Sequence, residues 1–444
     1  MKKALLIAVT ASLISTLLLV PLFSGCAPAT PGGSKDRSFK PLDPDFAVFW
    51  DRQTTESAQL LQDLAAEFNR SWQGIPIKVE RAGNYTDIFR KVSASIRAGV
   101  LPAMAVAYES MTNDYINAGA AVDLEPLLAD EEAGLSAEAL ADYIPGALEN
   151  NRFANHDNHL YAFPFAKSVL ILYYNKKVMQ DAGITAPPAT WDDFINQCRQ
   201  IKAKTGKYAH GVHADCSTVN GMIFSQGGDV LKDGKCLYDS PEALAVFRIY
   251  EILAKENLAW LVSPSSYEDN VALSKDEIAF VMRSSSSFSD MKLLMEGDTE
   301  RWGIAPIPQK DPAKPGTTLY GPNVCIFNTT EAHIQAAWAF MKFLTSPEVS
   351  VRWSLETGYL PVRRSTLHQP ELQQHWEKWE CNKVPYDCLA FARTEPNAPG
   401  WQEVRDLATR AVSEIMAGVT TAEKAAAALQ SGAERILARN ARPQ

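Results

Sequence analysis

Residues 46–80, FAVFWDRQTTESAQLLQDLAAEFNRSWQGIPIKVE, decide the fold. The run at 46–50 is short and apolar, which is typical of a buried strand. Thr54 then opens a helical pattern whose apolar positions are Leu60, Leu61, Leu64 and Phe68. Residues 75–79 read as the next strand. The stretch therefore predicts a strand, a helix and a second strand in succession.

The same alternation continues along the chain. Residues 85–97 predict a helix, and residues 103–107 predict a third strand. Strands that alternate with helices form a mainly parallel sheet covered by the helices. Ligands of such sheets bind in loops beyond the carboxyl ends of the strands. We therefore expect an α/β fold with its binding residues in those loops.

A second α/β pattern begins after Leu160. Residues 169–174 predict a strand, and Thr190 followed by Asp193 predicts a capped helix. Further strands are predicted at 278–282 and 302–307, and helices at 403–416 and 422–437. A chain of 444 residues is too long for a single typical core, so we expect two domains.

The first residues resemble an export signal. Two lysines precede an apolar stretch from residue 4 to residue 20, and Leu22-Phe23-Ser24-Gly25-Cys26 follows. That ending resembles the bacterial lipobox, whose cysteine is acylated, although an uncleaved membrane anchor is an alternative. We expect residues 1–25 to be a signal peptide and Cys26 the lipidated residue. Residues 26–45, rich in proline and glycine, would form the lipid anchor and a flexible tether.

Composition excludes some partners and sites. The formal net charge of −9 argues against nucleic acid, which requires clustered basic residues. Six cysteines follow Cys26, none in a C-x-x-C pattern, so zinc is not expected. In an oxidising compartment, Cys216 with Cys236 and Cys381 with Cys388 are candidate disulfides, but the sequence does not decide their pairing.

Motif searches give little sign of catalysis. The chain contains no G-x-S-x-G, H-E-x-x-H, G-x-G-x-x-G or Walker A pattern. Two histidine pairs, His156 with His159 and His210 with His213, have a spacing found in metal half-sites. The first pair lies in a polar turn, and the second lacks a further ligand motif, so we expect no metal site.

Seven short motifs occur in an order that carries a family resemblance. They are Gly83-Asn84-Tyr85, residues 97–102, residues 106–109, residues 161–165, residues 172–176, Thr190-Trp191 and Thr357-Gly358-Tyr359-Leu360-Pro361. The chain resembles the extracellular solute-binding proteins (family 1) of ABC importers, nearest to their glycerol-3-phosphate-binding members. The similarity runs from about residue 46 to residue 437.

The resemblance implies a two-lobed fold of the periplasmic-binding-protein type II, with a hinge and a ligand between the lobes. One lobe would comprise residues 46–165 and 318–345, and the other residues 166–317 and 346–444. The chain would cross between them near 163–167, 317–322 and 343–347. Closure around the ligand would produce the form that the permease recognises.

The resemblance also implies a set of ligand-binding residues. Carried over position by position, they are Tyr85, Glu109, Ser168, Ser284, Gly321, Tyr359 and Arg405. Glu109 would accept hydrogen bonds from polyol hydroxyls, and Arg405 would form a fork on a phosphate. Alone, each has an ordinary structural interpretation, such as a core aromatic for Tyr85 or a solvated helix face for Arg405.

Departures from the family pattern bear on the ligand. Glycerol-3-phosphate-binding members have tryptophans in the segment aligned with residues 211–215, where this chain has Val212 and His213. The pocket would then admit a larger head group, such as a glycerophosphodiester like glycerophosphocholine. Lys167, and Arg283 beside Ser284, would add positive charge suited to an anion, although both could be structural.

The function expected from the resemblance is transport. An exported, lipid-anchored monomer on the periplasmic or outer face of a bacterial membrane would deliver a small, phosphate-bearing solute to permease subunits served by a cytoplasmic ATPase. No catalysis and no cofactor are implied. Three alternatives remain open: a receptor for sugars or oligosaccharides, a surface adhesin or signalling receptor that reuses the fold, and a secreted hydrolase.

Overall fold

The computed structural model describes residues 38–440, except for the side chain of Thr55. The proposed signal peptide, Cys26 and most of the tether lie outside these residues. Within them, no helix combines the length and the apolar character needed to cross a bilayer.

A first sheet has the strand order β3-β2-β5-β17-β8. Its strands are β3 (Ile77–Arg81), β2 (Ala47–Asp51), β5 (Met104–Ala107), β17 (Asn323–Ile326) and β8 (Phe163–Pro164). β2 runs parallel to β3 and β5, whereas β17 is antiparallel to both of its neighbours. The strands predicted at 46–50, 75–79 and 103–107 are confirmed, with small shifts at their ends.

Two helices of this sheet show why the local sequence folds as predicted. In α1 (Thr55–Ser71), Leu61 and Leu64 are fully buried, in agreement with the helical spacing of the apolar residues. α2 (Tyr85–Ala98) begins with a capping box, in which Asn84 and Asp87 each accept the other's backbone N–H. These helices place the loops after β2 and before α2 at the carboxyl edge of the parallel strands.

A second sheet has seven strands in the order β13-β10-β14-β9-β16-β18, with β15 paired to β9. The strands are β9 (Ser168–Asn175), β10 (His210–Val212), β13 (Ala259–Leu261), β14 (Phe280–Ser284), β15 (Trp302–Pro306), β16 (Thr317–Tyr320) and β18 (Ala392–Thr394). The helix predicted after Thr190 is α8 (Trp191–Thr205), and the capping box of Thr190 with Asp193 is present.

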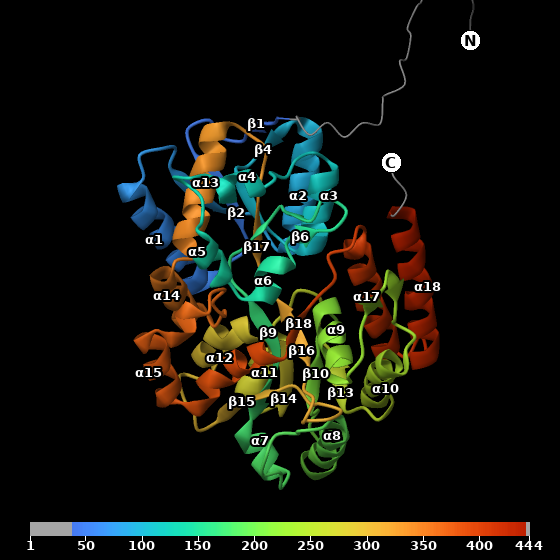
Figure 1. Cartoon of the computed structure of the whole chain (residues 1–444). Helices are drawn as coiled ribbons and strands as arrows, with labels where there is room; N and C mark the ends of the chain where they lie inside the picture. The colour runs from blue at the N-terminus through green and yellow to red at the C-terminus, as the bar shows by residue number, and fades with distance from the viewer. Residues whose placement is uncertain (1–37, 441–444) are drawn as a thin grey trace, which may run out of the picture. The chain divides into compact units, whose positions relative to one another are not determined.

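The chain passes between the sheets more than once. It leaves the first sheet after β8, enters the second at β9, and returns between β16 and β17. In Figure 1, β17 and α13 (Glu331–Leu344) lie among the blue and cyan elements of the first sheet. Val349 and Trp353 of the following helix, α14 (Pro347–Thr357), pack in the first core. The lobe boundaries stated above stay a prediction.

Helices also bundle beside the second sheet. α10 (Pro241–Lys255), α17 (Trp401–Met416) and α18 (Ala422–Asn440) pack against one another, and α9 (Cys216–Ser225) packs on β16. The helices predicted at 403–416 and 422–437 are therefore confirmed. Their apolar faces fill the core of the second sheet.

The remaining elements connect these layers. The helices are α3 (Glu109–Asn117), α4 (Glu125–Ala129), α5 (Ala137–Ala141), α6 (Pro145–Glu149), α7 (Lys176–Asp181), α11 (Glu268–Ser274), α12 (Phe288–Leu294), α15 (Pro370–Lys378) and α16 (Val384–Asp387). The short strands are β1 (Lys40–Pro41), β4 (Val100–Leu101), β6 (Arg152–Phe153), β7 (His159–Leu160), β11 (Leu231–Lys232) and β12 (Lys235–Cys236).

The six cysteines of the body are free. Cys198, Cys216, Cys236, Cys325, Cys381 and Cys388 are all buried and none is in a disulfide. The two candidate disulfides are therefore wrong. Two large cores already stabilise the folded chain, which removes the need for a covalent link.

Candidate functional site

A cavity of about 160 Å³ lies where loops of the two sheets meet. It receives Arg52 and Tyr108 from the ends of β2 and β5, and Ser284 from the end of β14. Six of the residues expected from the sequence line it together: Tyr85, Ser168, His213, Ser284, Gly321 and Tyr359. This convergence follows from the sheet geometry, because the loops beyond parallel strands gather at one edge.

Tyrosines form one wall of this cavity. The rings of Tyr85 and Tyr108 stack with centroids 4.0 Å apart and planes inclined by 26°. The Tyr85 hydroxyl is buried and has no hydrogen-bond partner in the described part of the chain. Burial raises the pKa of Tyr85 well above its ordinary value, so the hydroxyl stays neutral and can donate a hydrogen bond.

Serines at the end of β14 form another part of the lining. Ser284 Oγ lies 2.8 Å from Ser286 Oγ and accepts the backbone N–H of Ser286. Gly321 lies in the connection between β16 and β17, with a φ of 126°. A Cβ atom there would lie 2.9 Å from the carbonyl oxygen of Ala166, so only glycine fits. The wall therefore combines neutral hydroxyls with closely approaching backbone.

The cavity contains an arginine that the sequence interpretation missed. Arg52 is partly buried, and its Nη1 donates a hydrogen bond of 2.7 Å to the Tyr359 hydroxyl. Its guanidinium also lies over the Tyr85 ring, 5.2 Å from the centroid. Its position in the sequence could have identified Arg52 as a site residue, because it directly follows a predicted strand of a parallel sheet.

Arg283 also lines the cavity, but its charge is compensated. It donates two hydrogen bonds to Asp269, of 2.8 and 2.6 Å, and a third to the carbonyl of Ser266. The Asp269 side chain is fully buried. The positive charge expected from Arg283 is therefore balanced within the protein, which makes it a structural element of the wall.

Arg405 lies in an adjoining cavity of about 710 Å³, which shares Arg52, Tyr85, Tyr108, His213, Asp215 and Tyr267 with the first. Its Nη1 donates to Glu395 at 2.5 Å, and its Nη2 donates to the Ser217 hydroxyl at 3.1 Å. The side chain is only 7% exposed, so it does not project from a solvated helix face. Glu395 and Ser217 therefore bind the two terminal nitrogens of the fork that the resemblance assigned to a phosphate.

Glu109 and Lys167 line neither of these two cavities. Lys167 Nζ donates to Glu109 Oε1 at 3.2 Å and to Asn323 Oδ1 at 2.8 Å, and Asn323 Nδ2 donates to Glu109. Burial acts to raise the pKa of Glu109, but Lys167 and these hydrogen bonds outweigh it, and the pKa lies below its ordinary value. In the structure Glu109 and Lys167 bind each other, whereas the sequence analysis expected both to face a solute.

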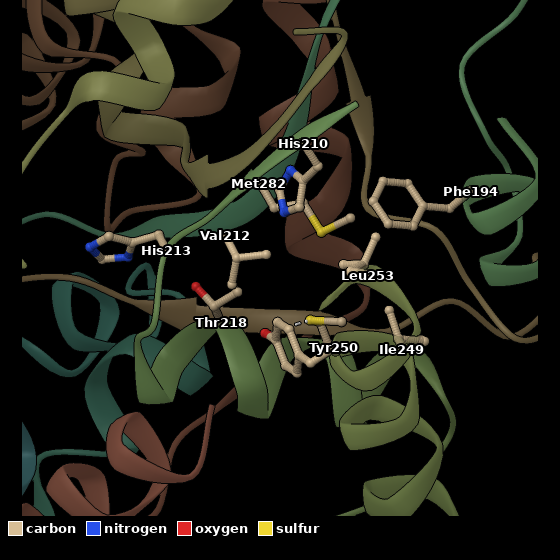
Figure 2. Close-up of a pocket in the computed structure, with 10 residues that line it drawn as sticks. Phe194, His210, Val212, His213, Thr218, Ile249, Tyr250, Leu253 and Met282 are labelled. Atoms are coloured by element: carbon tan, nitrogen blue, oxygen red, sulfur yellow. Dashed lines mark hydrogen bonds between the residues drawn. The ribbon is translucent and has the colours of Figure 1, made fainter. Parts of the chain in front are cut away.

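The two histidines of the 210–213 segment have different surroundings. His210 is buried, and its Nδ1 lies 3.0 Å from the carbonyl oxygen of Phe280. His213 borders both cavities and also a small void of about 10 Å³. Figure 2 shows it at the edge of this void, apart from the other lining residues. Burial, followed by the charge of Arg283, lowers the pKa of His213. Within residues 38–440, no group of three or more His, Cys, Asp or Glu side chains is arranged to hold a metal ion.

The family model of the bacterial extracellular solute-binding proteins matches residues 63–379. The sn-glycerol-3-phosphate-binding periplasmic protein of Brucella abortus is 22% identical over 398 residues, which cover 85% of this chain and 90% of that protein.

Two solved structures share the fold. UgpB from Mycobacterium tuberculosis, in complex with glycerophosphocholine, has a TM-score of 0.77 at 21% identity, covering 88% of this chain and 98% of that one. The GacH receptor of Streptomyces glaucescens, solved with acarbose, also has a TM-score of 0.77, at 18% identity and 90% and 99% coverage. By the family match, with the fold in agreement, this chain belongs to the bacterial extracellular solute-binding proteins, the two-lobed, non-enzymatic receptors that deliver small solutes to the permeases of ABC importers.

Proposed function

We propose that this protein binds glycerol-3-phosphate or a glycerophosphodiester such as glycerophosphocholine. The observation that carries the proposal is the lining of the first cavity. Serine and tyrosine hydroxyls gather there around Arg52, a guanidinium without an ion-pair partner in the described chain. Hydroxyls suit a polyol, and a guanidinium suits a phosphate.

The size of the cleft supports a ligand with a second group. The first cavity, about 160 Å³, is smaller than the roughly 300–1,000 Å³ typical of sites for drug-sized ligands. It adjoins the larger cavity, whose lining includes His213, Ala214 and Asp215. The absence of tryptophans from this segment leaves room for the second ester group of a phosphodiester.

A sugar is the second candidate, and one feature favours it. Asp215, which borders both cavities, could accept hydrogen bonds from sugar hydroxyls. The likeness to the GacH receptor, solved with acarbose, agrees with this candidate as well.

The remaining parts of the proposal concern location and delivery. We propose that residues 1–25 direct export and that acylated Cys26 holds the protein on the periplasmic or outer face of the membrane. The tether would leave the monomeric body free to meet the permease. The solute closes the lobes because it has a higher affinity for the closed form than for the open one.

Titration calorimetry with glycerol-3-phosphate, glycerophosphocholine and maltose tests the proposal. We expect one of the two phosphates to bind and maltose to give no heat. Tight binding of maltose, with no response to either phosphate, would overturn it. A thermal-shift measurement provides a second readout, because a ligand at a hundred times its Kd stabilises the fold by about 2.7 kcal/mol.

A further inference from the structure

The charged groups around the cleft are not equivalent. Four arginines line the two cavities, namely Arg52, Arg81, Arg283 and Arg405, and Arg81, at the end of β3, is exposed to solvent. Arg283 is held by Asp269 and Arg405 by Glu395, and both of these carboxylates are nearly inaccessible to solvent. A guanidinium already engaged with a buried carboxylate has little attraction left for a second anion.

Arg52 differs from Arg283 and Arg405 in its partners. Its hydrogen-bond partner is the neutral Tyr359 hydroxyl, and the group beneath it is the Tyr85 ring. Asp51, its neighbour in the chain, directs Oδ2 to the backbone N–H of Gln53 at 2.6 Å. Within residues 38–440, no carboxylate forms an ion pair with Arg52.

The position of Arg52 makes this lack of a partner consequential. The side chain is partly buried and lines the first cavity together with the serines at the end of β14. A guanidinium has five N–H donors, and a single hydrogen bond, to Tyr359, uses one of them. Withdrawing a charge from water without pairing it is costly, so the site gains most from a ligand that supplies the opposite charge.

We propose that Arg52 is the residue that binds the anionic group of the solute. Tyr359 orients the guanidinium, and the serines at the end of β14 bind the remaining oxygens of the anionic group. Arg283 and Arg405 act as positioning residues that hold the walls of the cleft. This assignment rests on the proposed function and replaces the role that the resemblance gave to Arg405.

The test compares Arg52→Gln, Arg52→Lys and Arg352→Gln. Arg352 is a surface arginine that pairs with Glu67 and lines neither cavity, so it serves as the matched control. With glycerol-3-phosphate as the probe, Arg52→Gln should weaken binding about 10- to 100-fold. Arg52→Lys, which keeps the charge but loses the fork, should fall between it and the wild type. The control should bind as the wild type does.

The outcomes separate this inference from the proposed function. If the wild type binds neither glycerol-3-phosphate nor glycerophosphocholine, the proposed function fails and the inference fails with it. If the wild type binds one of them and Arg52→Gln binds it within twofold, the inference alone is wrong. An Arg52→Lys protein as weak as Arg52→Gln would also overturn it. Urea unfolding of each variant shows whether a loss of binding reflects a loss of folding.

Discussion

Lys167 Nζ lies 3.2 Å from Glu109 Oε1, and the two side chains are only 1% and 7% exposed. Glu109 begins α3 beside the first sheet, whereas Lys167 directly precedes β9 of the second. Asn323, at the start of β17, binds both. The pair therefore lies where two passages of the chain between the sheets run side by side, and it fixes them to each other.

Replacing Lys167 with Met should destabilise the protein by about 3–5 kcal/mol, because Glu109 would be left as a buried charge without its partner. The double variant Glu109→Gln with Lys167→Met should recover much of this loss. Urea denaturation of the wild type, both single variants and the double variant measures the coupling. A Lys167→Met protein within 1 kcal/mol of the wild type would contradict the assigned role.

Tyr85→Phe tests the unpartnered hydroxyl in the cleft. If this hydroxyl donates to the solute, its removal should weaken binding by about 0.5–1.5 kcal/mol. The unfolding free energy of the ligand-free protein should not fall, since no hydrogen bond within the described chain is lost. Calorimetry and urea unfolding together separate the two effects. Unchanged affinity would place the hydroxyl outside the ligand contacts.

Asp51 should give the protein a distinctive dependence of stability on pH. Burial, only partly offset by hydrogen bonds and by Arg52, raises its pKa from 3.8 to about 6. The folded state therefore keeps a proton that the unfolded state has already released, and stability falls as the pH rises through this interval. The expected loss is about 3 kcal/mol. In urea titrations from pH 4 to 7, Asp51→Asn should flatten the profile, whereas Asp63→Asn on the exposed face of α1 should not.

Thiol titration distinguishes free cysteines from the disulfides that the spacing suggested. In protein carrying Cys26→Ser, six thiols should react in guanidinium, whereas two would react if both candidate pairs were linked. In the native protein we expect little reaction. Burial raises the pKa values, to about 11 for Cys236 and about 12 for Cys388, and it also blocks access.

Local signals predicted the elements well because each depends on neighbouring residues. The capping box at Thr190 and the buried leucines of α1 are examples, since their spacing within one or two helical turns is sufficient. The point at which the chain leaves the first core for the last time was harder to place. Helix α14 packs into that core through contacts that no local pattern encodes.

The candidate site was predicted in part. Motifs identified Tyr85, Tyr359, Ser168 and Ser284 but missed Tyr108, which also lines the cavity. The role of an arginine depends on which carboxylate lies beside it. Arg52 meets Tyr359 across 307 positions, and Lys167 meets Glu109 across 58. Glu395 forms an ion pair with Arg405 and so compensates its charge, and no spacing in the sequence reveals that pairing.

The insertion of β17 between β5 and β8 also dictates an order of folding. The first sheet is made largely from residues before 165, yet it stays split until residues 323–326 are available to join its two parts. Such distant pairings slow folding, because a long loop must close before they form.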